Sequence, residues 1–154
     1  ADDNLAKITE PYTLSPELGE VVGEHNGAHY YTIGQRRGLN IGGYEKPLFV
    51  ISTDTEKNVI YTGSGDDHPG LYRKGLFIPE NDEHWLREDL KLAVGESKKY
   101  SARIRYRQPL EPCTLHKRTD GLYIVFDRPQ RGVTPGQFAA WYHDEELIGS
   151  GVIN

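Results

Sequence analysis

The chain has 154 residues, 36% of them hydrophobic, which is enough for one ordinary domain or two small ones with modest cores. Its net charge of −5 argues against a protein that coats nucleic acid indiscriminately. No apolar run is long enough to cross a bilayer, and the first residues lack the basic start and apolar centre of a secretion signal, so we expect a cytoplasmic protein with no membrane partner.

The first half of the chain begins with a stretch that shows no sustained period. Residues 1–18, with Pro11 and Pro16, are therefore interpreted as a lead-in arm or linker. Residues 20–23 form a short apolar run. Residues 48–52 and 58–63 predict two strands joined by a polar turn at 54–57, which is typical of a hairpin.

Residues 25–39 combine aromatic rings, amide donors, paired cations and three glycines in one short segment. The glycines permit backbone turns or a close approach by a large ligand, and Tyr, Gln and Arg supply the stacking and forked hydrogen bonds that suit nucleic acids. Residues 30–37 form either a short helix or a loop, because the flanking glycines would end a helix there.

From residue 75 onward, short strands separated by turn signals predict an antiparallel barrel or sandwich. The expected strands are 100–107, 113–118, 122–126 and 138–142, with 147–153 closing the sheet, and the pair Asp120-Gly121 is a tight-turn signal. Residues 82–92 are the one helix candidate in this half. The expected fold is mainly β, with a small central β-rich domain over 19–75 followed by an antiparallel β-barrel over 76–154.

The positive charge is concentrated in one stretch. Residues 98–131 hold nine basic and three acidic residues, so this stretch is +6 and the remainder of the chain −11. Strict alternation in a strand over 101–107 would put Arg103, Arg105 and Arg107 on one face, where guanidinium groups can follow a phosphate backbone. The alternative is a solvated face whose cations pair with acids from elsewhere.

Other motifs carry weaker signals. The turn 134–137 would hold the Gln137 amide at a loop tip, although a plain type II turn is the preferred interpretation of this motif taken alone. His25 and His29 are four apart, but the Asn-Gly between them disfavours a helical metal site. Cys113 and His116 would point to opposite faces of a strand, so Cys113 is interpreted as a buried apolar residue and not as a nucleophile. No phosphate-binding loop or nucleophile elbow is present, so no catalytic or metal site is predicted.

Several of these motifs together resemble the C-terminal part of bacterial tRNA-specific 2-thiouridylases (tRNA-uridine 2-sulfurtransferases). The resemblance covers about residues 20–154 and rests on the segments Gly-Glu-His-Asn-Gly at 23–27, Tyr-Thr-Ile-Gly-Gln-Arg-Arg-Gly-Leu at 31–39, Pro-Leu-Phe-Val at 47–50, Arg-Tyr-Arg at 105–107, Thr-Pro-Gly-Gln at 134–137 and Gly-Ser-Gly-Val-Ile at 149–153. Ser150 stands where family members usually carry glycine. The chain holds no methionine, which either an excised fragment or removal of an initiator before Ala1 would explain.

The resemblance implies an enzyme that activates C2 of the wobble uridine with ATP and magnesium and then replaces its oxygen with sulfur. The ATP site and both catalytic cysteines would belong to an N-terminal catalytic domain outside this sequence, so the chain alone would be inactive and would bind no cofactor. Its expected partners are the tRNA anticodon stem-loop and that catalytic domain, with a sulfur-carrier protein as a further candidate. An alternative is a non-catalytic scaffold that docks the catalytic domain or the sulfur carrier. By motif position or by charge, the tRNA-binding candidates are Arg105, Tyr106, Gln137, Arg107, Arg103, Arg36 and Arg37.

Overall fold

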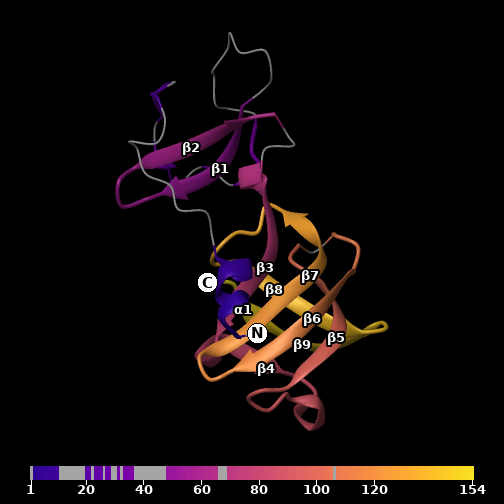
Figure 1. Ribbon diagram of the computed structural model, residues 1–154. Helices are drawn as coiled ribbons and strands as arrows, with labels where there is room; N and C mark the ends of the chain where they lie inside the picture. The colour runs from indigo at the N-terminus through magenta and orange to yellow at the C-terminus, as the bar shows by residue number, and fades with distance from the viewer. Residues whose placement is uncertain are drawn as a thin grey trace. The chain divides into compact units, whose positions relative to one another are not determined.

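The chain divides into two compact units in a computed structural model (Figure 1). The structure describes residues 2–10, 20–21, 23–25, 27–28, 31, 33–36, 48–65, 69–105 and 107–154. One unit comprises Ala1–Glu10 with Arg73–Asn154, and the other comprises Pro11–Tyr72. We call them the barrel unit and the hairpin unit and describe each by itself.

A curled antiparallel sheet of seven strands builds the barrel unit, in the order β3-β7-β6-β5-β8-β9-β4 (Figure 1). The two edge strands are consecutive in sequence, and the backbone N–H of Asn154, which follows β9, donates to Phe77 O in β3 at 3.0 Å. These links bring the sheet edges toward each other, which confirms the expected mainly β, barrel-like fold. The strands are β3 (Tyr72–Pro79), β4 (Glu83–Trp85), β5 (Ser97–Arg103), β6 (Glu111–Arg118), β7 (Gly121–Arg131), β8 (Phe138–His143) and β9 (Glu146–Val152).

Alternating side chains fill the interior of the barrel. In β6, for example, Cys113 and Leu115 point inward while His116 lies on the other face, as the period of two requires. Trp85 and Trp141 meet edge to face in the core, with ring centroids 5.1 Å apart. The other core side chains include Leu76, Ile78, Tyr100, Ile104, Leu122, Ile124, Phe126, Ile148 and Ile153.

A buried ion pair lies in the barrel interior. Lys117 follows the inward alternation of β6, and its ammonium group donates to the carboxylate of Glu83, with both side chains almost fully buried. The indole N–H of Trp85 donates to the other oxygen of Glu83 at 3.1 Å. Lys117 is therefore not part of a solvated cationic face, although it contributes to the positive count of residues 98–131.

Two expectations for the barrel unit were wrong. Residues 82–92 form no helix longer than one turn: β4 is flanked by the short 3₁₀ turns η4 (Glu80–Asp82) and η5 (Glu88–Leu90), because Glu83, His84 and Trp85 pair with β9. The strand expected over 100–107 ends at Arg103. There the Gln108 side chain accepts the Ile104 N–H at 2.8 Å in place of a neighbouring strand, and the chain bends.

The lead-in stretch contains an α-helix that the sequence analysis did not predict. Helix α1 (Asp2–Thr9) packs against β7 and buries Leu5. The Arg73 guanidinium donates to Thr9 O at 2.5 Å, and the Thr9 hydroxyl donates back to Leu5 O at 2.8 Å. Tertiary contacts therefore hold a helix that is too short to be stable alone.

The hairpin unit contains the predicted antiparallel pair, β1 (Leu48–Asp54) and β2 (Val59–Ser64), and the single-turn η3 (Pro69–Leu71). Asn58 has a positive φ of 55° in the connecting turn. Its side chain accepts the Ala28 N–H at 2.9 Å, and its carbonyl is 3.0 Å from His25 Nε2. Of the apolar run at 20–23, residues 20, 21 and 23 are described and carry no strand.

Candidate functional site

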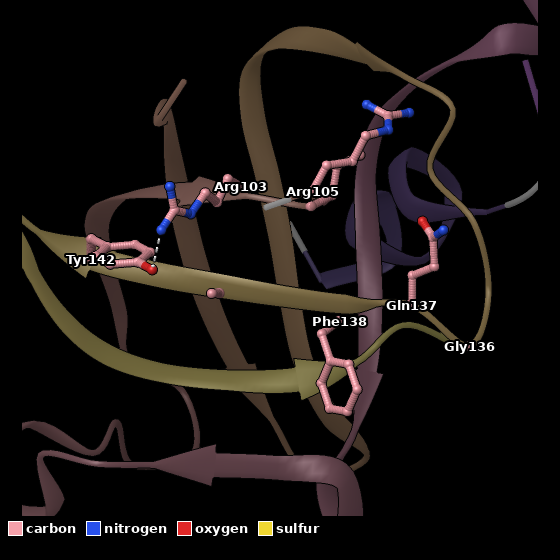
Figure 2. A pocket seen from close by; sticks show the side chains of 8 residues that line it. Arg103, Arg105, Gly136, Gln137, Phe138 and Tyr142 are labelled. Carbon is pink, nitrogen blue, oxygen red and sulfur yellow. Dashed lines mark hydrogen bonds between the residues drawn. The ribbon is translucent and has the colours of Figure 1, made fainter. Parts of the chain in front are cut away.

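A pocket of about 720 Å³ opens on the barrel unit between the end of β5, the turn at 134–137 and β8 (Figure 2). No carboxylate is among the lining residues that the structure describes. The lining comprises Arg103, Ile104, Arg105, Gly136, Gln137, Phe138, Ala140 and Tyr142.

Strand alternation builds the floor and rim of this pocket. On β8, Ala139 and Trp141 are fully buried, so Phe138, Ala140 and Tyr142 lie on the outer face. Arg103 of β5 is paired directly opposite Ala140. Residues paired in this way share a face of the sheet. The methyl group of Ala140 is therefore surrounded by the Arg103 guanidinium and the rings of Phe138 and Tyr142.

The Arg103 guanidinium is held in place by Tyr142. Its Nη2 donates to the Tyr142 hydroxyl at 2.8 Å, and its central carbon lies 5.0 Å from the centroid of the same ring (Figure 2). This stacked arrangement leaves other guanidinium N–H groups available to a ligand, because Arg carries five donors.

Arg105 lies in the bend after β5 and is exposed, and its guanidinium donates to the carbonyl of Arg131. Partial burial, followed by the positive charge of Arg131, lowers the pKa of Arg105. An arginine nevertheless stays protonated in proteins, so this group remains a cation at the pocket. A bound anion would offset the repulsion between the Arg105 and Arg131 cations.

The Gln137 amide is presented by a type II turn, as the sequence suggested. Gly136 has φ of 89°, and the Gln137 N–H donates to Thr134 O at 3.3 Å. Two further bonds of 2.8 Å fix the turn, from Gly136 N to Ile153 O and from Ile153 N to Gln137 O. Figure 2 shows the Gln137 amide directed to the side of the pocket on which the Arg105 guanidinium lies.

The structure brings together three of the seven predicted site residues, namely Arg103, Arg105 and Gln137. Arg107 is exposed in the turn after the bend, outside the lining of this pocket. Arg36 is exposed in the hairpin unit. The predictions for Tyr106 and Arg37 lie outside the described residues.

Acids do neutralise part of the positive stretch, but not at the pocket. Arg128 donates to both carboxylate oxygens of Glu111, at 3.0 and 2.8 Å, and Lys117 pairs with Glu83. Among the described residues, no carboxylate forms an ion pair with Arg103, Arg105 or Arg107. The alternative of a fully paired cationic face therefore holds for some cations of the stretch and fails for these three.

Sequence reasoning missed Phe138 and Tyr142 as pocket residues. It placed both in a strand but did not follow the face on which they lie. The alternation in Phe138-Ala139-Ala140-Trp141-Tyr142 contains the needed signal, because residues 138 and 142 must share a face with 140.

The other chemical candidates have structural roles. Cys113 is buried, and desolvation raises the pKa of its thiol to about 12, which suppresses the thiolate. His25 accepts the Gly27 N–H through Nδ1 at 3.0 Å, so its Nε2 carries the proton donated to Asn58 O.

In the part of the chain that the structure describes, no group of three or more His, Cys, Asp or Glu side chains could hold a metal ion. No described helix has the length and apolar character needed to cross a bilayer.

Comparison with known families matches nearly the whole sequence. Residues 7–64 match the family described as the tRNA methyl transferase PRC-barrel domain, and residues 78–153 match the aminomethyltransferase beta-barrel domain. The chain is 58% identical over 153 residues to the tRNA-specific 2-thiouridylase MnmA of Flavobacterium johnsoniae. The chain belongs to the tRNA-specific 2-thiouridylase family.

Other 2-thiouridylases show the extent of the match. MnmA of Christiangramia forsetii is 53% identical over 152 residues, and that of Chlamydia trachomatis is 48% identical over 135 residues. These alignments cover 99% and 87% of this chain but only 38% and 36% of the relatives. The Flavobacterium alignment covers 99% of this chain and 39% of the relative. The chain therefore corresponds to the C-terminal part of a 2-thiouridylase and spans about two fifths of its length.

Proposed function

We propose that this chain is the tRNA-docking part of a tRNA 2-thiouridylase that places sulfur on C2 of the wobble uridine. The family and the names of its relatives support a role in tRNA thiolation. One observation carries the docking role: the barrel pocket gathers Arg103, Arg105 and Gln137, and none of the described residues that line it is a carboxylate.

The chemistry of this pocket suits phosphate oxygens. A guanidinium is weakly hydrated and can donate two parallel hydrogen bonds to a phosphate. Two such groups, one at the end of β5 and one in the bend that follows it, together with an amide donor from the facing turn, would hold a backbone segment and fix its direction. Such contacts position a nucleic acid without reading its sequence, which fits an acidic protein with a local cationic surface.

The chemical step belongs, in this proposal, to a catalytic domain outside this chain. That domain would bind ATP and magnesium and would carry the reactive cysteines, whereas the only thiol here is buried with a raised pKa. Sulfur transfer to an anticodon base requires that the base leave its stack, and a remote docking surface can supply the binding energy that holds the loop open.

The first prediction tests the docking role by titrating a fluorescein-labelled anticodon stem-loop into the chain at two salt concentrations. Arg105→Ala should weaken binding about tenfold, or ~1.4 kcal/mol, and should reduce the salt dependence. Arg128→Ala removes the same charge from a guanidinium already paired with Glu111, so its affinity should stay within about twofold of wild type.

Equal affinities of the wild type and both variants would refute the assigned role of the pocket. Absence of stem-loop binding, together with capture of a purified sulfur-carrier protein, would instead favour the scaffold alternative.

A further inference from the structure

Phe138 is the most exposed aromatic side chain of the pocket. Its relative exposure is 65%, on the outer face of a strand whose neighbouring inward residues are completely buried. A single exposed apolar side chain needs no explanation by itself. This ring, however, lies in the lining of a pocket whose polar groups are mainly cationic and amide donors.

The two aromatic rings of this face differ in what already covers them. Tyr142 is engaged by Arg103, which stacks over its ring and donates to its hydroxyl. Among the described residues, no aromatic or cationic group packs on the Phe138 ring. Phe138 is therefore the ring whose face is open to a ligand.

The spacing along β8 leaves room for a flat group. Phe138 and Tyr142 are four residues apart on the strand, or roughly 13 Å at about 3.3 Å per residue, and only the methyl group of Ala140 lies between them on this face. Figure 2 shows the Phe138 ring directed away from the Gln137 amide, so the ring and the donors occupy different sides of the pocket.

We propose that Phe138 is the stacking platform for one unpaired nucleobase of RNA, with Arg105 and Gln137 holding the adjoining phosphate. This inference rests on the proposed function and adds to it a residue and a type of contact. Every nucleobase has a π face, so the contact favours a single strand without selecting a sequence. Two arginines, with no carboxylate among the described lining residues, favour a polyanion over an apolar peptide.

The experiment compares two single-stranded probes with the whole chain, a uridine heptamer and an abasic heptamer with the same sugar-phosphate backbone. Phe138→Leu keeps an apolar side chain of similar size but removes the ring. It should weaken uridine-heptamer binding about tenfold and abasic-heptamer binding by less than about twofold. Phe138→Tyr keeps an aromatic ring at this position and should bind both probes within about twofold of wild type.

A matched control removes an exposed apolar group elsewhere. Val94 is 58% exposed in the loop before β5, and Val94→Ala should leave both affinities unchanged. Circular dichroism of each variant establishes that the barrel is folded.

Salt dependence separates failure of this inference from failure of the proposed function. Stacking releases no counterions, so Phe138→Leu should leave the slope of log Kd against log salt unchanged, whereas Arg105→Ala should reduce it by about 0.7. Equal weakening of both probes by Phe138→Leu, or no weakening of either, overturns the stacking role and leaves the docking role standing if Arg105→Ala still weakens binding. If the wild-type chain binds neither heptamer nor the stem-loop, both proposals fall.

Discussion

At the scale of single residues, basic side chains have different roles depending on which groups the fold places beside them. Arg128 is tied to Glu111, while Arg105 faces a backbone carbonyl and a second cation. Lys117 is directed into the core by strand alternation and meets Glu83 there. Composition identified all three as positive charge, but only tertiary pairing decides which charge is available to a ligand.

The buried pair of Glu83 and Lys117 gives a sharp stability prediction. Glu83→Gln removes one partner and leaves an ammonium group without its counter-charge in the core, so the free energy of unfolding should fall by about 3–5 kcal/mol. Urea denaturation measures the change. The double variant Glu83→Gln/Lys117→Met removes both charges and should recover a large part of the loss. A single-variant loss below about 1 kcal/mol would show that the pair is effectively solvated.

At the scale of elements, glycines in the last strand set how closely the barrel walls approach. A Cβ on Gly149 would lie 2.5 Å from Trp141 Cζ2 and 2.7 Å from His84 O, and one on Gly151 would lie 2.5 Å from Ile78 Cγ2. Distances this short require the core indole or the backbone of β4 to move at Gly149, and the Ile78 side chain to move at Gly151. Ser150, between them, lies on the outer face and has no such restriction.

We predict that Gly149→Ala lowers the free energy of unfolding by about 1–3 kcal/mol through overpacking against Trp141. Ser150→Ala is the matched control, because it changes the neighbouring position of the same strand and should stay within about 0.5 kcal/mol. Thermal and urea unfolding of both variants provide the measurement. Equal stabilities would mean that β4 and β9 separate without cost.

Local sequence pattern predicted most strands of the barrel, because β5 to β9 each carry clear alternation between turn signals. It failed at β4, whose three residues are specified by pairing with β9 and by the contact of Trp85 with Trp141, both distant in sequence. It failed also at the end of β5, where the Gln108 side chain replaces a strand partner. The pocket residues divide in a similar way. Motif and charge identified Arg103, Arg105 and Gln137, whereas Phe138 and Tyr142 were placed in a strand without following the alternation that puts both on its outer face.

At the scale of the whole molecule, the chain consists of two units with separate sets of internal contacts. In the hairpin unit, Asn58 joins the turn between β1 and β2 to the preceding segment through Ala28 and His25. Its left-handed backbone is a conformation that Asn adopts more readily than Ala. One residue therefore supports both the turn and the tertiary contact.

We predict that Asn58→Ala destabilises the hairpin unit by about 1–3 kcal/mol, since it adds backbone strain to the loss of a hydrogen bond. Asn58→Gly loses only the hydrogen bond and should cost about half as much. Hydrogen exchange resolves the two units: amides of β1 and β2 should lose protection while those of β6 and β7 should not. A parallel loss in both sets would show that the units unfold together.

The edge-to-face pair of Trp85 and Trp141 has a practical consequence. These are the only two tryptophans of the chain, and both are buried in the barrel core. Indole emission excited at the red edge therefore reports the barrel alone, and the tyrosine-containing hairpin unit is invisible to it. A denaturation curve recorded in that way isolates one half of the molecule without any label.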